Sequence, residues 1–132
     1  PPRSTLFPYT TLFRSKQLKS LRNKGVLIIG SGALIHNLPL AGQKMRYNDR
    51  TPYGWEVEYD AWIKQQLDAR NFPNIISYAS SHMLGKLAAP TPDHFVPVLY
   101  SLGLMESSDE IKYFYEAEPT IPAFSERSFI IG

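Results

Sequence analysis

The sequence of 132 residues contains no cysteine. This absence excludes a disulfide framework and a metal site built from thiolates. The sequence also lacks an apolar run long enough to span a bilayer, and it does not start with the basic, apolar and small-residue pattern of a signal peptide. From these absences we expect a cytoplasmic protein of one domain with no membrane partner.

The sequence also has almost no excess of positive or negative charge. The formal net charge is +2, from 14 basic and 12 acidic side chains, and two of the basic ones lie in residues 1–15. That segment, PPRSTLFPYTTLFRS, resembles the in-frame translation of a sequencing-adapter oligonucleotide, so we expect it to be non-native. The rest of the chain has 12 basic and 12 acidic residues. The charge therefore gives no reason to expect a nucleic-acid partner.

The most informative stretch that is present is GVLIIGSGALIHNL, residues 25–38. Four consecutive branched apolar residues, Val26 to Ile29, lie between glycines, which is typical of a strand buried on both faces of an α/β sheet. The glycines that follow would let the chain turn at the end of this strand, the edge where open α/β sheets bind ligands. His36 comes next and is the first candidate site residue.

Two familiar motifs fail on this stretch. A dinucleotide fingerprint needs a third glycine where Ile35 stands, and a nucleophile elbow around Ser31 needs glycine at Ile29 and Ala33. Ser31 is therefore predicted to be a turn residue. For His36 the residues alone leave two interpretations open, a structural hydrogen-bonding side chain and a catalyst.

Hydrophobic periodicity predicts several helices. The clearest is 54–70, where large apolar residues recur on one stripe: Trp55, Tyr59, Trp62, Ile63 and Leu67. A short basic helix is predicted at 16–24 and another helix at 71–78, while 37–52 is predicted to be a loop over the rim of the site.

Two short apolar and aromatic runs, 111–116 and 128–131, predict strands that join the sheet in antiparallel orientation. The predicted fold class is α/β, with a central mixed sheet and flanking helices.

A second histidine stretch, PTPDHFVPVL, occupies residues 90–99. Thr91 can cap a helix there, with Pro92 and Asp93 in its first turn. His94 then falls in the first turn, where the helix dipole opposes protonation and leaves a lone pair for a metal. The simpler alternative is a capped surface helix with an incidental histidine.

A third histidine, His82, lies in a predicted loop at 80–89. It is a weaker candidate for a metal ligand, because no partner motif fixes its geometry.

The motifs GSGALIHNL and PTPDHFVPVLYSLG, followed by SERSFIIG, together resemble the class III extradiol ring-cleaving dioxygenases, in particular their DOPA extradiol branch. The resemblance runs from Lys24 to Gly132. It implies that His36 is the acid/base of the active site, sometimes counted as a metal ligand, and that His94 is a metal ligand. It also implies Fe(II) or Zn(II) as the cofactor and a small catechol with dioxygen as the substrates.

Members of that family carry about as much chain again before this region, including two further histidines of the metal site. The resemblance thus implies that residues 16–132 are the C-terminal part of one dioxygenase domain, incomplete and inactive alone. The alternative from another class is a non-enzymatic metal-carrying or interaction domain with the same fold. A hydrolase is a third possibility, disfavoured by the missing elbow glycines.

Overall fold

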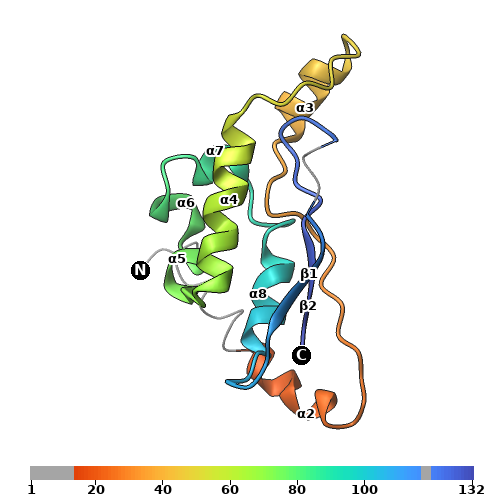
Figure 1. The fold of residues 1–132 in the computed structure, drawn as a ribbon, viewed down its shortest axis with the longest axis vertical. Coiled ribbons are helices and arrows are strands. Elements are labelled where there is room, and N and C mark those ends of the chain that lie inside the picture. Colours follow the sequence, from red (N-terminus) through yellow and green to blue (C-terminus); the bar gives the residue numbers. More distant parts are fainter. Residues whose placement is uncertain (1–13, 117–119) are drawn as a thin grey trace.

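The computed structural model describes residues 14–116 and 120–132 (Figure 1). Most of the segment expected to be non-native, residues 1–13, lies outside these described residues. The described elements follow the chain in this order: η1 (Lys16–Leu18), α2 (Lys19–Arg22), α3 (Leu38–Met45), α4 (Trp55–Asp68), α5 (Phe72–Ile76), α6 (Tyr78–Ser81), α7 (Gly85–Ala88), α8 (Val96–Gly103), β1 (Ile111–Tyr115) and β2 (Ser128–Ile131).

The two predicted terminal strands form an antiparallel hairpin. Ile111 pairs with Ile131 and Tyr113 with Phe129, and the register shifts between Tyr113 and Tyr115. Within the part of the chain that the structure describes, the sheet consists of these two strands. The combination of helices with a sheet confirms the α/β class.

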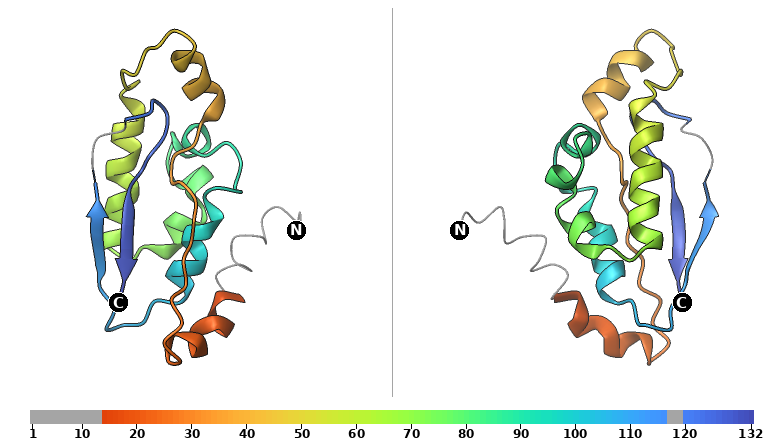
Figure 2. Two further views of the ribbon diagram at one scale, coloured as in Figure 1. Left: turned by 90° about the vertical axis from the view of Figure 1, so that its right-hand side faces the viewer. Right: turned by 60° about the vertical axis from the view of Figure 1, so that its left-hand side comes forward.

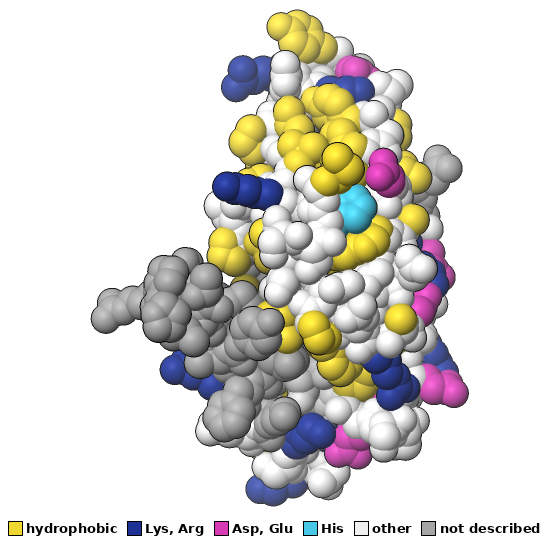
Figure 3. Space-filling view, turned by 90° about the vertical axis from the view of Figure 1, so that its left-hand side faces the viewer, with side chains coloured by type: hydrophobic (Ala, Val, Ile, Leu, Met, Phe, Trp, Pro, Cys, Tyr) yellow, Lys and Arg dark blue, Asp and Glu magenta, His cyan; other side chains and the backbone are white. Residues whose placement is uncertain are grey.

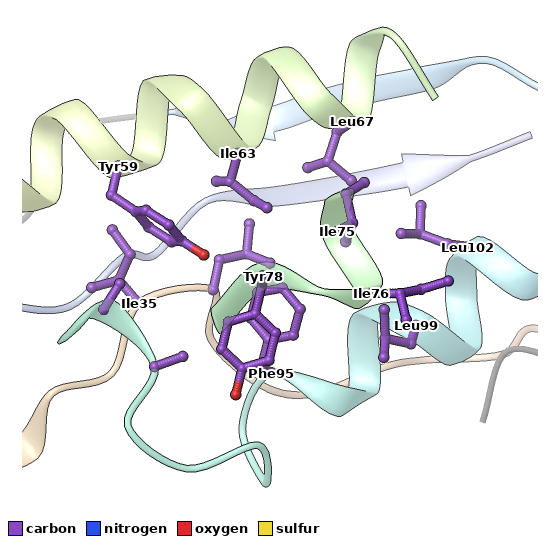
Figure 4. Packing of buried hydrophobic residues seen from close by; sticks show 13 residues of the cluster. Ile35, Tyr59, Ile63, Leu67, Ile75, Ile76, Tyr78, Phe95, Leu99 and Leu102 are labelled. Carbon is purple, nitrogen blue, oxygen red and sulfur yellow. The ribbon is translucent and has the colours of Figure 1, made fainter. Parts of the chain in front are cut away.

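Helix α4 is the element around which the core packs, and it confirms the predicted helix with slightly shorter ends. Tyr59, Ile63 and Leu67 are fully buried on the predicted stripe, and Trp55 and Trp62 pack partly buried against the same cluster. Figure 4 shows Tyr59, Ile63 and Leu67 pointing from α4 toward side chains of α5 and α8. The remaining labelled members of this core are Ile35, Ile75, Ile76, Tyr78, Phe95, Leu99 and Leu102.

The expected buried strand at Val26 to Ile29 is wrong for this structure. The segment is extended but lies outside any strand, and Leu27 and Ile29 are 74% and 79% exposed. Figure 2 shows it running along the molecule as a single extended chain between α2 and α3. A strand buried on both faces needs neighbours at both edges and a layer over each face. The described residues provide a layer over one face, formed by α8.

The loop predicted at 37–52 is also wrong in its first half, where α3 forms. Its N-cap is Asn37, whose side-chain oxygen accepts a hydrogen bond from the Leu40 N–H at 3.2 Å, and Pro39 occupies the first turn. Both are standard helix-start signals. The loop predicted at 80–89 likewise contains α7. Helices of this length give weak periodicity, because they complete only one or two turns.

The face turned toward the viewer in Figure 3 includes the side of the molecule formed by α5, α6 and α7. Hydrophobic side chains gather over part of this face, and a histidine ring reaches the surface among them (Figure 3). Among the described helices, none combines the length and apolar character needed to cross a membrane.

Candidate functional site

His36 is held in a buried position between two other segments of the chain. Its backbone N–H donates to the carbonyl of Ala88 at 2.8 Å, and on the other side it forms an antiparallel bridge with Phe124. The residue is only 3% exposed. Its ring nitrogens face two backbone oxygens, Nε2 the carbonyl of Thr91 at 2.9 Å and Nδ1 that of Ala33 at 3.3 Å.

These contacts restrict what the His36 ring can do. In a neutral imidazole one nitrogen donates and the other presents a lone pair. The ring can therefore donate to only one of the two carbonyl oxygens. To act as a base, the ring nitrogen that carries the lone pair must leave the carbonyl oxygen it faces and accept a proton from the substrate.

His94 lies in the turn that leads into α8. The predicted cap at Thr91 is wrong, because α8 begins at Val96 with Pro97 in its first turn. Proline has no N–H and is best tolerated in a first turn, so Pro97 sets the helix start. His94 consequently stands before the helix, with its side chain 51% exposed. Its backbone carbonyl accepts a hydrogen bond from the Ala33 N–H at 2.9 Å, which ties it to the His36 segment.

The structure brings the two predicted histidines together. The ring centres of His36 and His94 are 5.1 Å apart, and the ring planes are inclined by 49°. Metal–nitrogen distances of about 2.0–2.1 Å place two imidazoles on one tetrahedral ion with ring centres roughly 5 Å apart. The pair thus fits two positions of a metal site by separation. Among residues 14–116 and 120–132, no group of three or more histidine, cysteine or acidic side chains is placed to hold a metal ion.

Asp93 is a member of the site that sequence reasoning assigned only to helix capping. Its carboxylate lies 3.5 Å from Nε2 of His94. A hydrogen bond from the Thr91 side chain holds the pKa of Asp93 below its ordinary value, and the nearby charges of His94 and His36 act in the same direction. Its position next to His94 in the PTPDH motif was the signal that could have identified it.

His82 is placed elsewhere. Its ring lies 4.8 Å from that of Trp62 and 5.6 Å from that of Tyr59, against the aromatic stripe of α4. Its Nδ1 accepts a hydrogen bond from the Leu84 N–H at 3.2 Å. The structure therefore gives His82 aromatic neighbours and does not bring it into the pair formed by His36 and His94.

Glu56 is a buried carboxylate that holds the chain next to His36 in place. Its burial was not predicted from the sequence. It is fully buried, and its Oε1 accepts hydrogen bonds from the N–H groups of Tyr53 at 2.8 Å and Ala123 at 3.2 Å. The carbonyl of Ala123 in turn accepts from the Asn37 N–H at 3.0 Å. Glu56 thereby connects the start of α4 to the segment that bridges His36. Among residues 14–116 and 120–132, nothing forms a hydrogen bond with its other oxygen, Oε2.

Comparison with known proteins shows the family of the chain. The family described as "Catalytic LigB subunit of aromatic ring-opening dioxygenase" matches residues 15–125. This match covers most of the chain, including both histidine motifs, and the protein therefore belongs to the LigB family of class III extradiol dioxygenases.

Several curated relatives carry the name 4,5-DOPA dioxygenase extradiol. The protein of Escherichia coli K12 is 30% identical over 100 residues, which are 73% of this chain and 35% of the relative. That of Portulaca grandiflora is 28% identical over 107 residues, covering 76% of this chain and 36% of the relative. The Beta vulgaris protein is 33% identical over 86 residues, 65% of this chain and 31% of the relative. The chain thus spans about a third of the length of these relatives.

A solved structure shares the fold. The crystal structure of an uncharacterized protein from Escherichia coli K12 matches with a TM-score of 0.73 and 24% identity, covering 89% of this chain and 48% of that one.

Proposed function

We propose that this chain is part of an extradiol dioxygenase that opens the ring of a catechol such as DOPA with dioxygen at a non-heme metal. The observation that carries the proposal is the approach of His36 and His94 to 5.1 Å between ring centres, in a chain that belongs to a ring-opening dioxygenase family. Two imidazoles at this separation suit a site where one ring binds a metal and the other handles a proton nearby.

The two histidines take different roles in this proposal. The His94 side chain is half exposed, and among the described residues its ring makes one polar contact, with Asp93, so it can turn toward a metal. Fe(II) or Zn(II) bound there would supply the positive charge that holds a deprotonated catechol. His36 is buried and fixed. Its Nε2 now faces the Thr91 carbonyl. In this proposal, Nε2 gives up that contact and exchanges a proton with a substrate hydroxyl.

Two histidines do not complete such a metal site. We therefore propose that further ligands come from polypeptide beyond residues 16–132, which would be the C-terminal part of one dioxygenase domain. The share of the relatives covered by this chain supports this view. In isolation the chain is expected to bind metal weakly, because affinity falls when ligands are missing.

The alternative is a non-enzymatic metal-carrying or interaction domain with the same fold. One observation favours it: both ring nitrogens of His36 face backbone carbonyl oxygens, an arrangement that a purely structural histidine also adopts.

The deciding experiment compares three histidine variants, His36→Gln, His94→Gln and His82→Gln. The chain is co-expressed with the unmatched part of the E. coli relative, loaded with Fe(II) or Zn(II), and assayed for ring-opened product from DOPA and for bound metal. His94→Gln should lose metal. His36→Gln should retain metal and lose roughly 100-fold or more in turnover, the usual contribution of a general acid/base.

His82→Gln is the matched control and should keep both metal and turnover. Metal loss in His36→Gln would instead assign His36 as a ligand. If all three proteins bind metal alike and none yields product, the non-enzymatic alternative is correct.

A further inference from the structure

The backbone from Leu27 to Gly32 is extended and is not paired with any other described part of the chain. The segment is fixed at both ends, by the Val26 N–H donating to Leu21 and the Ala33 N–H donating to His94. Between these points, no N–H or C=O group makes a hydrogen bond within the described part of the chain. An extended backbone with both edges unpaired is a template for adding β-strands.

One face of this segment is already covered. A Cβ on Gly32 would lie 2.1 Å from the carbonyl oxygen of His94, and one on Gly30 would lie 2.8 Å from that of Pro97. The segment therefore lies directly on the start of α8. What it lacks are neighbours at its edges and a layer over its outer face, where Leu27 and Ile29 are 74% and 79% exposed.

A groove of about 800 Å³ runs between this segment and the hairpin. The segment and residues of α8 form one side and the floor, and the opposite side is β2 with Phe129 to Ile131. Ile130 on that side is 54% exposed. The two walls meet at one end, where His36 and Phe124 form an antiparallel bridge. They separate beyond it, because among the described residues the pairing does not continue from the bridge to β2.

We propose that this groove is the docking site for a β-strand of the polypeptide that the curated relatives possess beyond the region matched here. About two thirds of the length of those relatives has no counterpart in this chain. The occupant must be extended, so that it can pair with Leu27 to Gly32. It must also be apolar on the side that meets Leu27, Ile29 and Ile130.

The docked strand would complete a sheet whose end carries His36. Since His94 lines the same groove, the occupant would also reach the metal-binding side of the site. This inference extends the proposed function, but its test needs neither metal nor catechol. Failure of docking and failure of the reaction can therefore be told apart.

The experiment measures amide hydrogen exchange in the full 132-residue chain, alone and co-purified with the unmatched part of the E. coli relative. In the chain alone, the amides from Leu27 to Gly32 should exchange as in an open chain. In the complex they should slow by about 100-fold or more, because strand pairing protects amides.

Two variants, Leu27→Glu and Ile29→Glu, should leave the chain alone folded, since both side chains are exposed, and should weaken the complex by roughly 10-fold or more. Met83→Glu is the matched control: Met83 is 90% exposed and lies outside the groove, so its complex should be unchanged.

Three outcomes would overturn the proposal. The unmatched part of the E. coli relative does not co-purify with the chain, or it co-purifies without protecting the amides from Leu27 to Gly32. In the third outcome, the chain alone already protects these amides by forming a dimer. The last outcome would identify a second copy of this chain as the occupant.

Discussion

The molecule has a packed side, formed by α4 and the core around it, and an open side, formed by the extended segment from Leu27 to Gly32. The same types of apolar residue are buried on the first and exposed on the second. On the packed side, Ile63 of α4 is completely buried in the core cluster, which also contains residues of α5 and α8. On the open side, Ile29 is 79% exposed on an extended segment whose backbone makes no hydrogen bond from Leu27 to Gly32 within the described part of the chain. The candidate site lies where the two sides meet, with His36 buried and His94 half exposed. Local sequence thus determines which residues are apolar, and the surrounding chain determines whether they become core.

The largest expected effect comes from breaking the packed side. Ile63→Ala removes a fully buried side chain from the centre of the core. The lost apolar contacts and the cavity should lower the free energy of unfolding by about 2–5 kcal/mol. Urea unfolding followed by circular dichroism measures this. A loss below about 1 kcal/mol would show that the core around α4 is not well packed.

The next effect concerns the contact that joins the two sides. Gly32→Ala places a Cβ 2.1 Å from the His94 carbonyl oxygen, so the turn before α8 must move away. Overpacking of this kind should cost roughly 1–3 kcal/mol and should change the NMR signals of the His36 and His94 rings.

Gly42→Ala is the matched control for that substitution. Gly42 lies inside α3, and a Cβ there meets nothing within 4 Å. The change should stabilise the helix by up to about 1 kcal/mol, because alanine is the better helix former. Unchanged histidine signals in Gly32→Ala would contradict the close contact between the segment and α8.

Much of the packed side could be predicted from sequence. The stripe on α4 was found because fourteen helical residues give a clear period, and the hairpin because its strands are rich in aromatic and branched residues. The pairing of His36 with His94 was predicted only through the family motifs. Spacing along the chain cannot tell which distant segments meet.

The failures have physical causes as well. The run from Val26 to Ile29 reads as a buried strand, but burial depends on neighbours that the described residues do not provide. The start of α8 was misplaced because two prolines, Pro92 and Pro97, each suit a first turn. The burial of Glu56 could not be predicted from the apolar stripe of α4, because a carboxylate rarely lies in a core unless backbone N–H groups bind it.

A smaller effect tests how the open segment is anchored to the rest of the molecule. Arg22, shortly before the segment, donates two hydrogen bonds to Asp109 at 2.6 and 3.0 Å, and a third to the carbonyl of Leu104. The Arg22 guanidinium holds the pKa of Asp109 below its ordinary value. Asp109→Asn should therefore lower stability at neutral pH by about 1 kcal/mol.

The lowered pKa of Asp109 also predicts how the stability changes with pH. A carboxyl group whose pKa is lowered by folding stabilises the protein above its unfolded pKa of about 3.9, and this contribution is lost as the pH falls through the folded pKa. The stabilities of the original protein and of Asp109→Asn should thus differ above about pH 4 and converge below it. Thermal unfolding from pH 7 to pH 2 measures this, and a constant difference throughout would exclude the ion pair as the cause.

The smallest effect is expected on the open side, from Ile29→Ala. The substitution is chemically identical to Ile63→Ala, but Ile29 has few contacts to lose because it is 79% exposed. Its free energy of unfolding should change by less than about 0.5 kcal/mol in urea unfolding of the chain alone. A cost approaching that of Ile63→Ala would mean that Ile29 is buried in solution, by closure of the groove or by a second copy of the chain. Repeating the measurement over a range of protein concentrations separates these two causes, because only association depends on concentration.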